Sequence, residues 1–294
     1  RDQPRSRGLG DVYKRQDIGI LWTGDKVVAC IDKPTMQFVN PLLKRKAFIW
    51  WNFPVSDYVR DRLLLGAVYG NGTDIDDDIS AFISNPMEHA EASKIALFSI
   101  ADYAWNMDAY KSDASWRRAV RYLMPGHAAA LQVFASHNSD LGGNEHDFRR
   151  EESEQIRPAL ERLLDAYCRE GKREVAAASA VTEECERMIA SADLLLASDE
   201  NPALIKEISP WLIQFKLLGE YGREVLCMLA AQCDGKKTEL EKAASHAKAL
   251  QVLMKKIDAT YNQNGFQPGV KTGSCHLKPA FDRLYQEVVQ RTGK

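Results

Sequence analysis

The chain has 294 residues, of which 45% are apolar, so it can bury one large hydrophobic core or two of ordinary size. Its 39 basic and 41 acidic residues nearly cancel and are well mixed, which excludes the basic stripe typical of nucleic-acid-binding proteins. No stretch approaches the roughly 18 consecutive apolar residues that a membrane-spanning helix needs. We therefore expect no nucleic-acid partner and no membrane span.

The cysteines and histidines do not predict a metal site. The six cysteines form no C-x-x-C pair, and the six histidines form no H-E-x-x-H motif. Several cysteines fall on predicted helices, where a thiol packs as a small hydrophobic group. We expect the thiols to be inert and expect no structural zinc.

The first sixteen residues, RDQPRSRGLGDVYKRQ, contain no Met and no apolar stretch of the kind found in a signal peptide. Their tail, GDVYKRQ, resembles adaptor-derived sequence at the edges of truncated gene fragments. We expect residues 1–16 to be a non-native leader and the native protein to continue upstream. The fold is therefore predicted from residue 17 onward.

Three short apolar runs in the first part of the chain are predicted to be strands. They are IGILWT at 18–23, AFIWWN at 47–52 and AFISN at 81–85. A polar loop containing Pro34 and Pro41 is expected between the first two strands. Strands that alternate with helices indicate a parallel sheet covered by helices. Three such strands look like the end of a larger sheet.

Two helices are expected around the third strand. The first is predicted from Asp57 through Leu65, with Ser56 as its N-cap, and the second from Glu88 to about Asn106. The first part of the chain therefore reads as an α/β fold.

The second part of the chain is predicted to be helical throughout. SHNSDLGGNEHDFRREES, residues 136–153, is the longest polar, glycine-containing break, and the domain boundary is placed there, giving domains 17–148 and 149–294. About five helices are expected beyond it, the last at roughly 279–291. The clearest helix carries one apolar stripe with alternating spacings of three and four residues, which predicts packing in a helical bundle. The stripe consists of Leu240, Ala243, Ala247, Leu250, Met254, Ile257 and Tyr261.

Each predicted strand ends in a hydrogen-bonding side chain, namely Thr23, Asn52 and Asn85. The carboxyl ends of parallel strands are where barrel enzymes build their sites. Trp50 shares a strand face with Asn52, and Asp57 follows shortly after. Amide, hydroxyl and carboxylate groups bind sugar hydroxyls, and an indole covers an apolar ring face. This combination suits a carbohydrate site.

The same residues have purely structural interpretations. Asp57 could stabilise the start of its predicted helix, Trp50 could belong to the core, and Asn85 with Pro86 could form a helix-entry turn. Spacing alone leaves both interpretations open.

Long motifs of the chain resemble glycoside hydrolase family 84, and are closest to its bacterial members. The motifs are WWNFPVSDYVRDRLLLGAVYGNGT, ISNPMEHAEASKIALFSIADYAWN, LWTGDKVV, HNSDLGGNEHDFRREES, ISPWLIQFKLLGEYG and NQNGFQPGVKT. The family consists of β-N-acetylglucosaminidases and includes the enzymes that remove O-linked N-acetylglucosamine from proteins. The likeness extends from about Ile18 to the C-terminus.

The resemblance implies a catalytic TIM barrel, of which residues 17–148 hold roughly the sixth to eighth strands, followed by a helical-bundle domain. Asp57 matches the family aspartate that binds the 4- and 6-hydroxyls of the sugar, and Asn52 and Asn85 match asparagines that line the same pocket. Trp50 matches an aromatic residue that borders the N-acetyl group.

Thr23 and Val27 match a less well-defined pair near the acetamide and the aglycone.

The family mechanism is retaining and substrate-assisted: the acetamide oxygen attacks the anomeric carbon and forms an oxazoline. One aspartate orients the acetamide, and its neighbour acts as acid and then as base. No metal or organic cofactor takes part. The aspartate pair belongs to an earlier strand, so we expect no catalytic residue in this chain. The run Asp76–Asp78 is rejected as a substitute, because it lies between two strands where the family has a variable, exposed segment.

We therefore expect a fragment of a retaining exo-β-N-acetylglucosaminidase that acts on an N-acetylglucosamine-containing glycan or glycoprotein and is inactive by itself. One alternative is a non-catalytic helical interaction or carbohydrate-binding module, and another is a glucosaminidase directed at hyaluronan or glycan ends. Unpaired edge strands should favour self-association, so a homodimer is expected. Bacterial relatives are commonly exported, which makes a periplasmic or secreted parent the working expectation.

Overall fold

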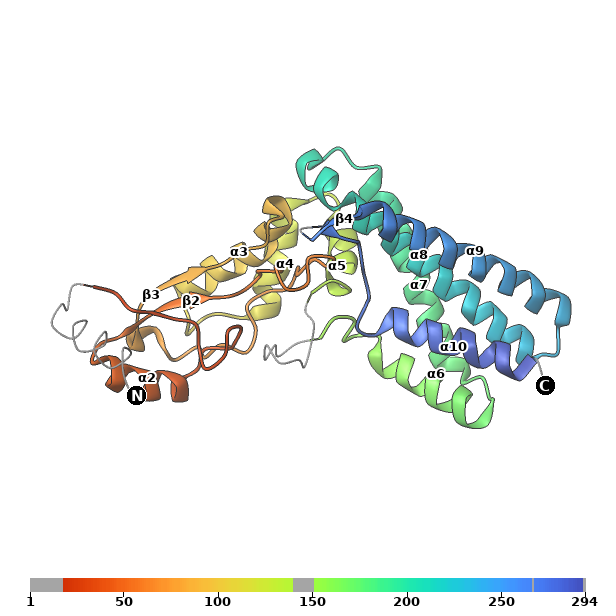
Figure 1. Ribbon diagram of the computed structural model, residues 1–294, viewed down its shortest axis with the longest axis horizontal. Helices are drawn as coiled ribbons and strands as arrows, with labels where there is room; N and C mark the ends of the chain where they lie inside the picture. The colour runs from red at the N-terminus through yellow and green to blue at the C-terminus, as the bar shows by residue number, and fades with distance from the viewer. Residues whose placement is uncertain (1–17, 140–150, 266, 293–294) are drawn as a thin grey trace.

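The structure is a computed structural model that describes residues 18–139, 151–265 and 267–292. The predicted leader, residues 1–16, and most of the predicted break at 136–153 lie outside these ranges. The molecule is elongated, with a sheet-containing part at one end and a set of long helices at the other (Figure 1). In the described residues no helix is both long and apolar enough to cross a membrane.

The sheet has three parallel strands in the order β1-β2-β3, as predicted. They are β1 (Leu21–Trp22), β2 (Ala47–Trp51) and β3 (Ile79–Ser84). Phe48 lies opposite both Leu21 and Ala81. Because the strands run in parallel, Thr23, Asn52 and Asn85 all follow the same edge of the sheet.

The two faces of the sheet differ. Ile49 and Trp51 on β2 are buried, and the Trp51 ring lies 5.8 Å from the ring of Phe82. On the opposite face, Leu21 on β1 is 49% exposed and Ile83 on β3 is 37% exposed. Helices therefore cover only one face of the described sheet.

The predicted polar loop after β1 is wrong, because it contains helix α2 (Lys33–Leu43). The Asp32 side chain caps this helix by accepting from the Thr35 amide at 3.0 Å. Pro34 lies in the first turn, where a missing N–H costs nothing, and Pro41 lies in the last turn. Met36, Val39 and Leu43, which are buried, have the spacing of a helix face.

The predicted helix at 57–65 is also wrong. Residues 57–62 form turns, and residues 63–65 have no regular secondary structure. The Leu65 amide donates to the Asn138 carbonyl at 2.7 Å, and the Gly66 amide donates to the Ser139 carbonyl at 3.1 Å. These tertiary hydrogen bonds replace the local ones that a helix would make.

The remaining helices of the sheet-containing part are α3 (Ala90–Trp105), which confirms the predicted long helix, α4 (Ser112–Leu123) and α5 (Ala128–Ser136). The acidic run Asp76–Asp78 forms a short 3-10 helix, η1, just before β3. This agrees with its interpretation as a charged helix or loop start.

Five helices follow residue 151 in the described chain, as predicted. They are α6 (Arg157–Glu170), α7 (Val175–Leu196), α8 (Pro202–Cys233), α9 (Lys237–Tyr261) and α10 (Leu277–Thr292). A short antiparallel pair, β4 (Asn262–Asn264) and β5 (Gln267–Pro268), joins the last two. Of the seven residues in the predicted apolar stripe of α9, Leu240, Ala243, Ala247 and Met254 are buried, and the other three are partly buried.

The cysteines are less uniform than predicted. Cys185 is buried in the hydrophobic core and Cys30 is buried with its thiol 3.5 Å from the Tyr69 carbonyl, whereas Cys227 and Cys233 are exposed. Among the residues that the structure describes, no group of three or more His, Cys, Asp or Glu side chains is placed to hold a metal ion.

Candidate functional site

The side-chain amide of Asn52 is the centre of the edge at which the strands end. Its Oδ1 accepts from Trp50 Nε1 at 2.9 Å and from Asn85 Nδ2 at 3.1 Å. Its Nδ2 donates to the Val27 carbonyl at 2.6 Å. One amide therefore joins the ends of β2 and β3 to the turn that follows β1.

Backbone contacts hold these strand ends in register. The backbone N–H of Asn85 donates to the Trp51 carbonyl at 2.9 Å, which extends the β2–β3 pairing past the end of β3. The Ser84 hydroxyl donates to the Phe53 carbonyl at 2.7 Å. The two asparagines are thus positioned by the sheet itself and do not depend on a flexible loop.

The turn after β1 presents Thr23 and Val27. The Thr23 hydroxyl donates to the Lys26 carbonyl at 3.3 Å, and Gly24 has a φ of 104°, which favours glycine. A Cβ atom at Gly24 would lie 2.7 Å from the Cβ of Ala29. The turn leaves the Val27 side chain 69% exposed while its carbonyl holds Asn52.

Asp57 is exposed and does not cap a helix, because no helix begins there. Among the described residues, its carboxylate takes part in none of the hydrogen bonds or ion pairs that the structure shows. The structural interpretation of Asp57 as a helix cap is therefore excluded. The carboxylate remains available to a ligand.

The structural interpretations of Trp50 and Asn85 stay open. Trp50 is 36% exposed, on the same uncovered sheet face as Leu21 and Ile83. The residue that precedes the first turn of α3 is His89, four positions after Asn85. Both side chains donate to the Asn52 oxygen, which is compatible with a supporting role and with a binding role.

Hydrogen-bonding capacity divides these residues into two kinds. The Asn52 oxygen already accepts two hydrogen bonds, and one of its two N–H groups is used, so Asn52 mainly holds the site together. Asn85 uses one N–H group and keeps its carbonyl for a ligand. Asn85, Asp57 and Thr23 are therefore the residues with hydrogen-bonding capacity left for a ligand.

Two sequence profiles match successive parts of the chain. Residues 6–136 match the profile described as beta-N-acetylglucosaminidase, and residues 152–285 match the profile of the bacterial GH84 post-catalytic domain. This chain belongs to glycoside hydrolase family 84. The first match begins inside residues 1–16, the segment that was expected to be a non-native leader.

Solved structures of this family share the fold. The structure of CpGH84D has a TM-score of 0.81 and 27% identity, and the match covers 98% of this chain and 49% of that one. CpGH84B has a TM-score of 0.81 at 24% identity, covering 91% and 45% of the two chains. A mutant O-GlcNAc hydrolase from Thermobaculum terrenum has a TM-score of 0.73 at 21% identity, covering 94% and 56%. The chain thus spans about half the length of these structures.

Curated relatives match over a shorter region. Protein O-GlcNAcase of Rattus norvegicus and that of Mus musculus are each 34% identical to this chain over 98 residues. The matched region is 33% of this chain and 11% of each relative.

This family 84 chain has a second polar cluster, beyond α5, that the sequence did not reveal. His137 Nδ1 lies 2.8 Å from Ser153 Oγ, and His137 Nε2 lies 2.7 Å from Glu184 Oε1. Hydroxyl, imidazole and carboxylate are the groups of a hydrolytic triad. However, Ser153 is only 1% exposed and His137 only 2%, so both groups are buried. We assign the cluster a structural role.

Glu152 is a further buried carboxyl group at the junction of the two parts. It is 3% exposed, and its Oε1 accepts from the Cys275 amide at 2.6 Å. Burial raises the pKa of Glu152 to about 7, although the Cys275 amide and the charge of Arg62 act in the opposite direction. The ordinary pKa of a glutamate is 4.5. Between pH 4.5 and 7, Glu152 therefore keeps a proton in the folded chain that it has lost in the unfolded chain.

Replacing Glu152 with Gln is expected to stabilise the chain at pH 8 but not at pH 5. Between pH 4.5 and 7 the folded state binds more protons than the unfolded state, so the free energy of unfolding falls as pH rises. The loss amounts to at most roughly 3 kcal/mol. Glu152→Gln keeps a carbonyl for Cys275 and cannot ionise. Urea unfolding at both pH values measures the difference, with exposed Glu161→Gln as control; a difference that does not grow with pH would contradict the raised pKa.

Proposed function

We propose that this chain is part of a retaining exo-β-N-acetylglucosaminidase that hydrolyses terminal or O-linked N-acetylglucosamine in glycans or glycoproteins. The observation that carries the proposal is the Asn52 amide, which binds both Trp50 and Asn85 at the carboxyl edge of a parallel sheet in a family 84 chain. The exposed Asp57 carboxylate follows that edge within five residues.

We propose further that residues 17–148 are the last strands of a TIM barrel, roughly the sixth to eighth, and that residues 149–294 form the helical-bundle domain. The half-open sheet face supports this, because Leu21, Trp50 and Ile83 would line the barrel interior if more strands closed the sheet. Both β1 and β3 lack a second neighbouring strand in the described residues. Either edge can therefore accept one.

In this proposal the chain binds and orients the sugar. Asp57 accepts from the 4- and 6-hydroxyls, Asn85 contributes its free amide groups, and the Trp50 ring borders the N-acetyl group. Thr23 and Val27 lie toward the acetamide and the aglycone.

The acetamide oxygen forms a bond to the anomeric carbon as the bond from that carbon to the leaving oxygen breaks. An acid protonates the leaving oxygen. Water then opens the oxazoline and restores the acetamide. An aspartate pair on an earlier strand, outside these residues, moves the protons.

The 294-residue chain by itself is expected to hydrolyse no aryl N-acetylglucosaminide. The sugar-binding residues are present, but the aspartates that the proposal needs for proton transfer are not among these residues. The measurement is release of the aryl alcohol by the purified chain, compared with a longer polypeptide that includes the upstream strands. Turnover by the chain alone would contradict the proposal that the proton-transferring aspartates lie outside these residues. A longer polypeptide that binds N-acetylglucosamine without hydrolysing it would instead favour a carbohydrate-binding module.

A further inference from the structure

We propose that the helical part of the molecule positions the connection that carries Asp57. We call residues 57–62, which follow β2, the Asp57 loop. The inference deepens the proposed function and rests on it in one respect, namely that Asp57 binds the sugar. The contacts themselves do not depend on that function.

Asp61 is the point at which the helical part holds the Asp57 loop. Its backbone carbonyl accepts from Trp211 Nε1 at 3.0 Å and from the Lys271 amide at 2.7 Å. Its side chain forms an ion pair with Lys271 Nζ at 2.5 Å. Trp211 lies on α8, and Lys271 lies between β5 and α10. Three interactions from two distant segments therefore meet on one loop residue.

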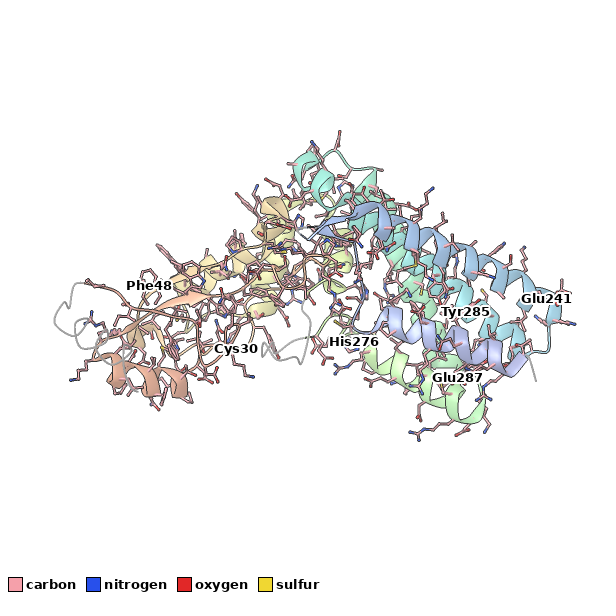
Figure 2. The ribbon with its side chains drawn as sticks, viewed as in Figure 1. Cys30, Phe48, Glu241, His276, Tyr285 and Glu287 are labelled. Atoms are coloured by element: carbon pink, nitrogen blue, oxygen red, sulfur yellow. The ribbon has the colours of Figure 1, made fainter. Side chains whose placement is uncertain are left out.

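The neighbours of Asp61 are also in contact with the helical part. Arg60 Nη1 donates to the Gly265 carbonyl at 3.2 Å, in the turn between β4 and β5. Arg62 Nη1 lies 4.0 Å from Cys275 Sγ, a weaker contact. The segment that supplies these partners runs through the junction, where Figure 2 shows His276, far from Phe48 on the sheet.

Two backbone hydrogen bonds within residues 56–62 shape the Asp57 loop. The Val59 amide donates to the Ser56 carbonyl and the Arg62 amide to the Val59 carbonyl, both at 2.9 Å. A segment without regular secondary structure depends on its tertiary partners and opens more readily when they are removed. The helical part therefore decides where the Asp57 carboxylate lies.

The same helix, α8, also holds the connection that leaves β3. Glu207 Oε1 accepts from the Ala92 amide at 2.7 Å, in the first turn of α3, where amides lack a partner within the helix. The ring of His89 meets the Trp211 ring edge-on at a centroid distance of 5.0 Å. Trp211 thus contacts the connections that follow both Asn52 and Asn85. Figure 1 shows α8 extending from this junction along the helical part.

The test uses Trp211→Phe, which keeps a ring against His89 but removes the N–H donor, and Lys271→Ala, with Lys271→Arg as the conservative rescue. Trp105→Phe is the matched control, because Trp105 is 91% exposed. In the 294-residue chain, hydrogen exchange of the Asp57 loop amides should accelerate in Trp211→Phe combined with Lys271→Ala, while exchange in α9 and α10 stays unchanged. Unchanged exchange in the loop, or acceleration spread through all helices, would overturn the inference.

KM and kcat of the longer polypeptide provide a second test, because a residue with a purely structural role would not change KM selectively. Trp211→Phe should raise KM by about tenfold, equivalent to one lost hydrogen bond, and leave kcat nearly unchanged, because Asp57 binds the sugar in ground and transition states alike. Lys271→Ala should also raise KM, whereas Lys271→Arg should keep KM near that of the unaltered polypeptide. A fall in kcat at constant KM would overturn positioning. If the wild-type longer polypeptide shows no turnover, the proposed function fails, and the exchange experiment alone decides the inference.

Discussion

Asp57→Ala in the longer polypeptide is expected to lower kcat/KM by roughly 2–4 kcal/mol, which is about 30- to 1,000-fold. The carboxylate is exposed and makes no hydrogen bond or ion pair within the described chain, so its acceptor capacity is free for the sugar. Removing it would leave two bound hydroxyl groups without their charged acceptor. An effect below about tenfold would mean that Asp57 is not a sugar ligand.

Two further measurements separate binding from folding. Asp57→Ala should change the free energy of unfolding of the 294-residue chain by less than about 0.5 kcal/mol, because the residue caps no helix and lies on the surface. Asp199→Ala is the matched control, since Asp199 is another exposed aspartate, in the connection before α8. It should alter neither activity nor stability. A large loss of stability in Asp57→Ala would restore the structural interpretation.

His137→Ala is expected to lower the free energy of unfolding by roughly 3 kcal/mol at neutral pH. The imidazole is buried between the Ser153 hydroxyl and the Glu184 carboxylate, and its ring lies 5.5 Å from the ring of Phe215. Its loss leaves both polar groups without that partner and removes ring packing. Arg187, which also binds Glu184, is too exposed to compensate fully.

The pH dependence of the free energy of unfolding tests whether the contact with Glu184 causes the destabilisation of His137→Ala. Burial raises the pKa of Glu184, but hydrogen bonds and charges from His137 and Arg187 outweigh it, so the pKa is lowered. Because the pKa of Glu184 is lowered, this carboxylate stabilises the folded state above pH 4.5, and the stabilisation is lost as the pH falls below that value. The difference between His137→Ala and the unaltered chain should therefore shrink in acid.

Urea unfolding at pH 7 and below pH 4.5 measures both effects of His137→Ala. His246→Ala is the control, because His246 is exposed and its ion pair with Glu224, at 3.5 Å, should contribute less than about 1 kcal/mol. If His137→Ala matched the control, the cluster would have no structural role, and its triad-like geometry would need a chemical explanation.

Hydrophobic periodicity predicted the elements whose signal is local. The three strands, α3 and the apolar stripe of α9 all match the structure, because burial of one face imposes a spacing on neighbouring residues. The same logic placed Asn52 and Asn85 together, since strands that run in parallel end at one edge. Their hydrogen bond of 3.1 Å confirms that geometry.

Local sequence signals do not predict two segments of the chain correctly, α2 and residues 57–65. The two prolines of α2 favour a loop, although the apolar residues have helical spacing and Pro34 occupies a position that tolerates proline. A capping pattern at Ser56 predicted a helix that tertiary hydrogen bonds from Leu65 and Gly66 prevent. In both cases the outcome depended on partners that the local pattern does not contain.

The sequence by itself determined the family, the strand ends and the residue types gathered there. Only the tertiary structure decided that Asn52 is mainly a support, that Asp57 is free, and that His137 joins segments on either side of residues 140–150. It also decided that Trp211 and Lys271 hold a loop 150 and 210 residues away. The physical reason is that these hydrogen bonds join groups that packing brings together. The periodicity of apolar residues along the chain does not predict which distant partner a polar group contacts.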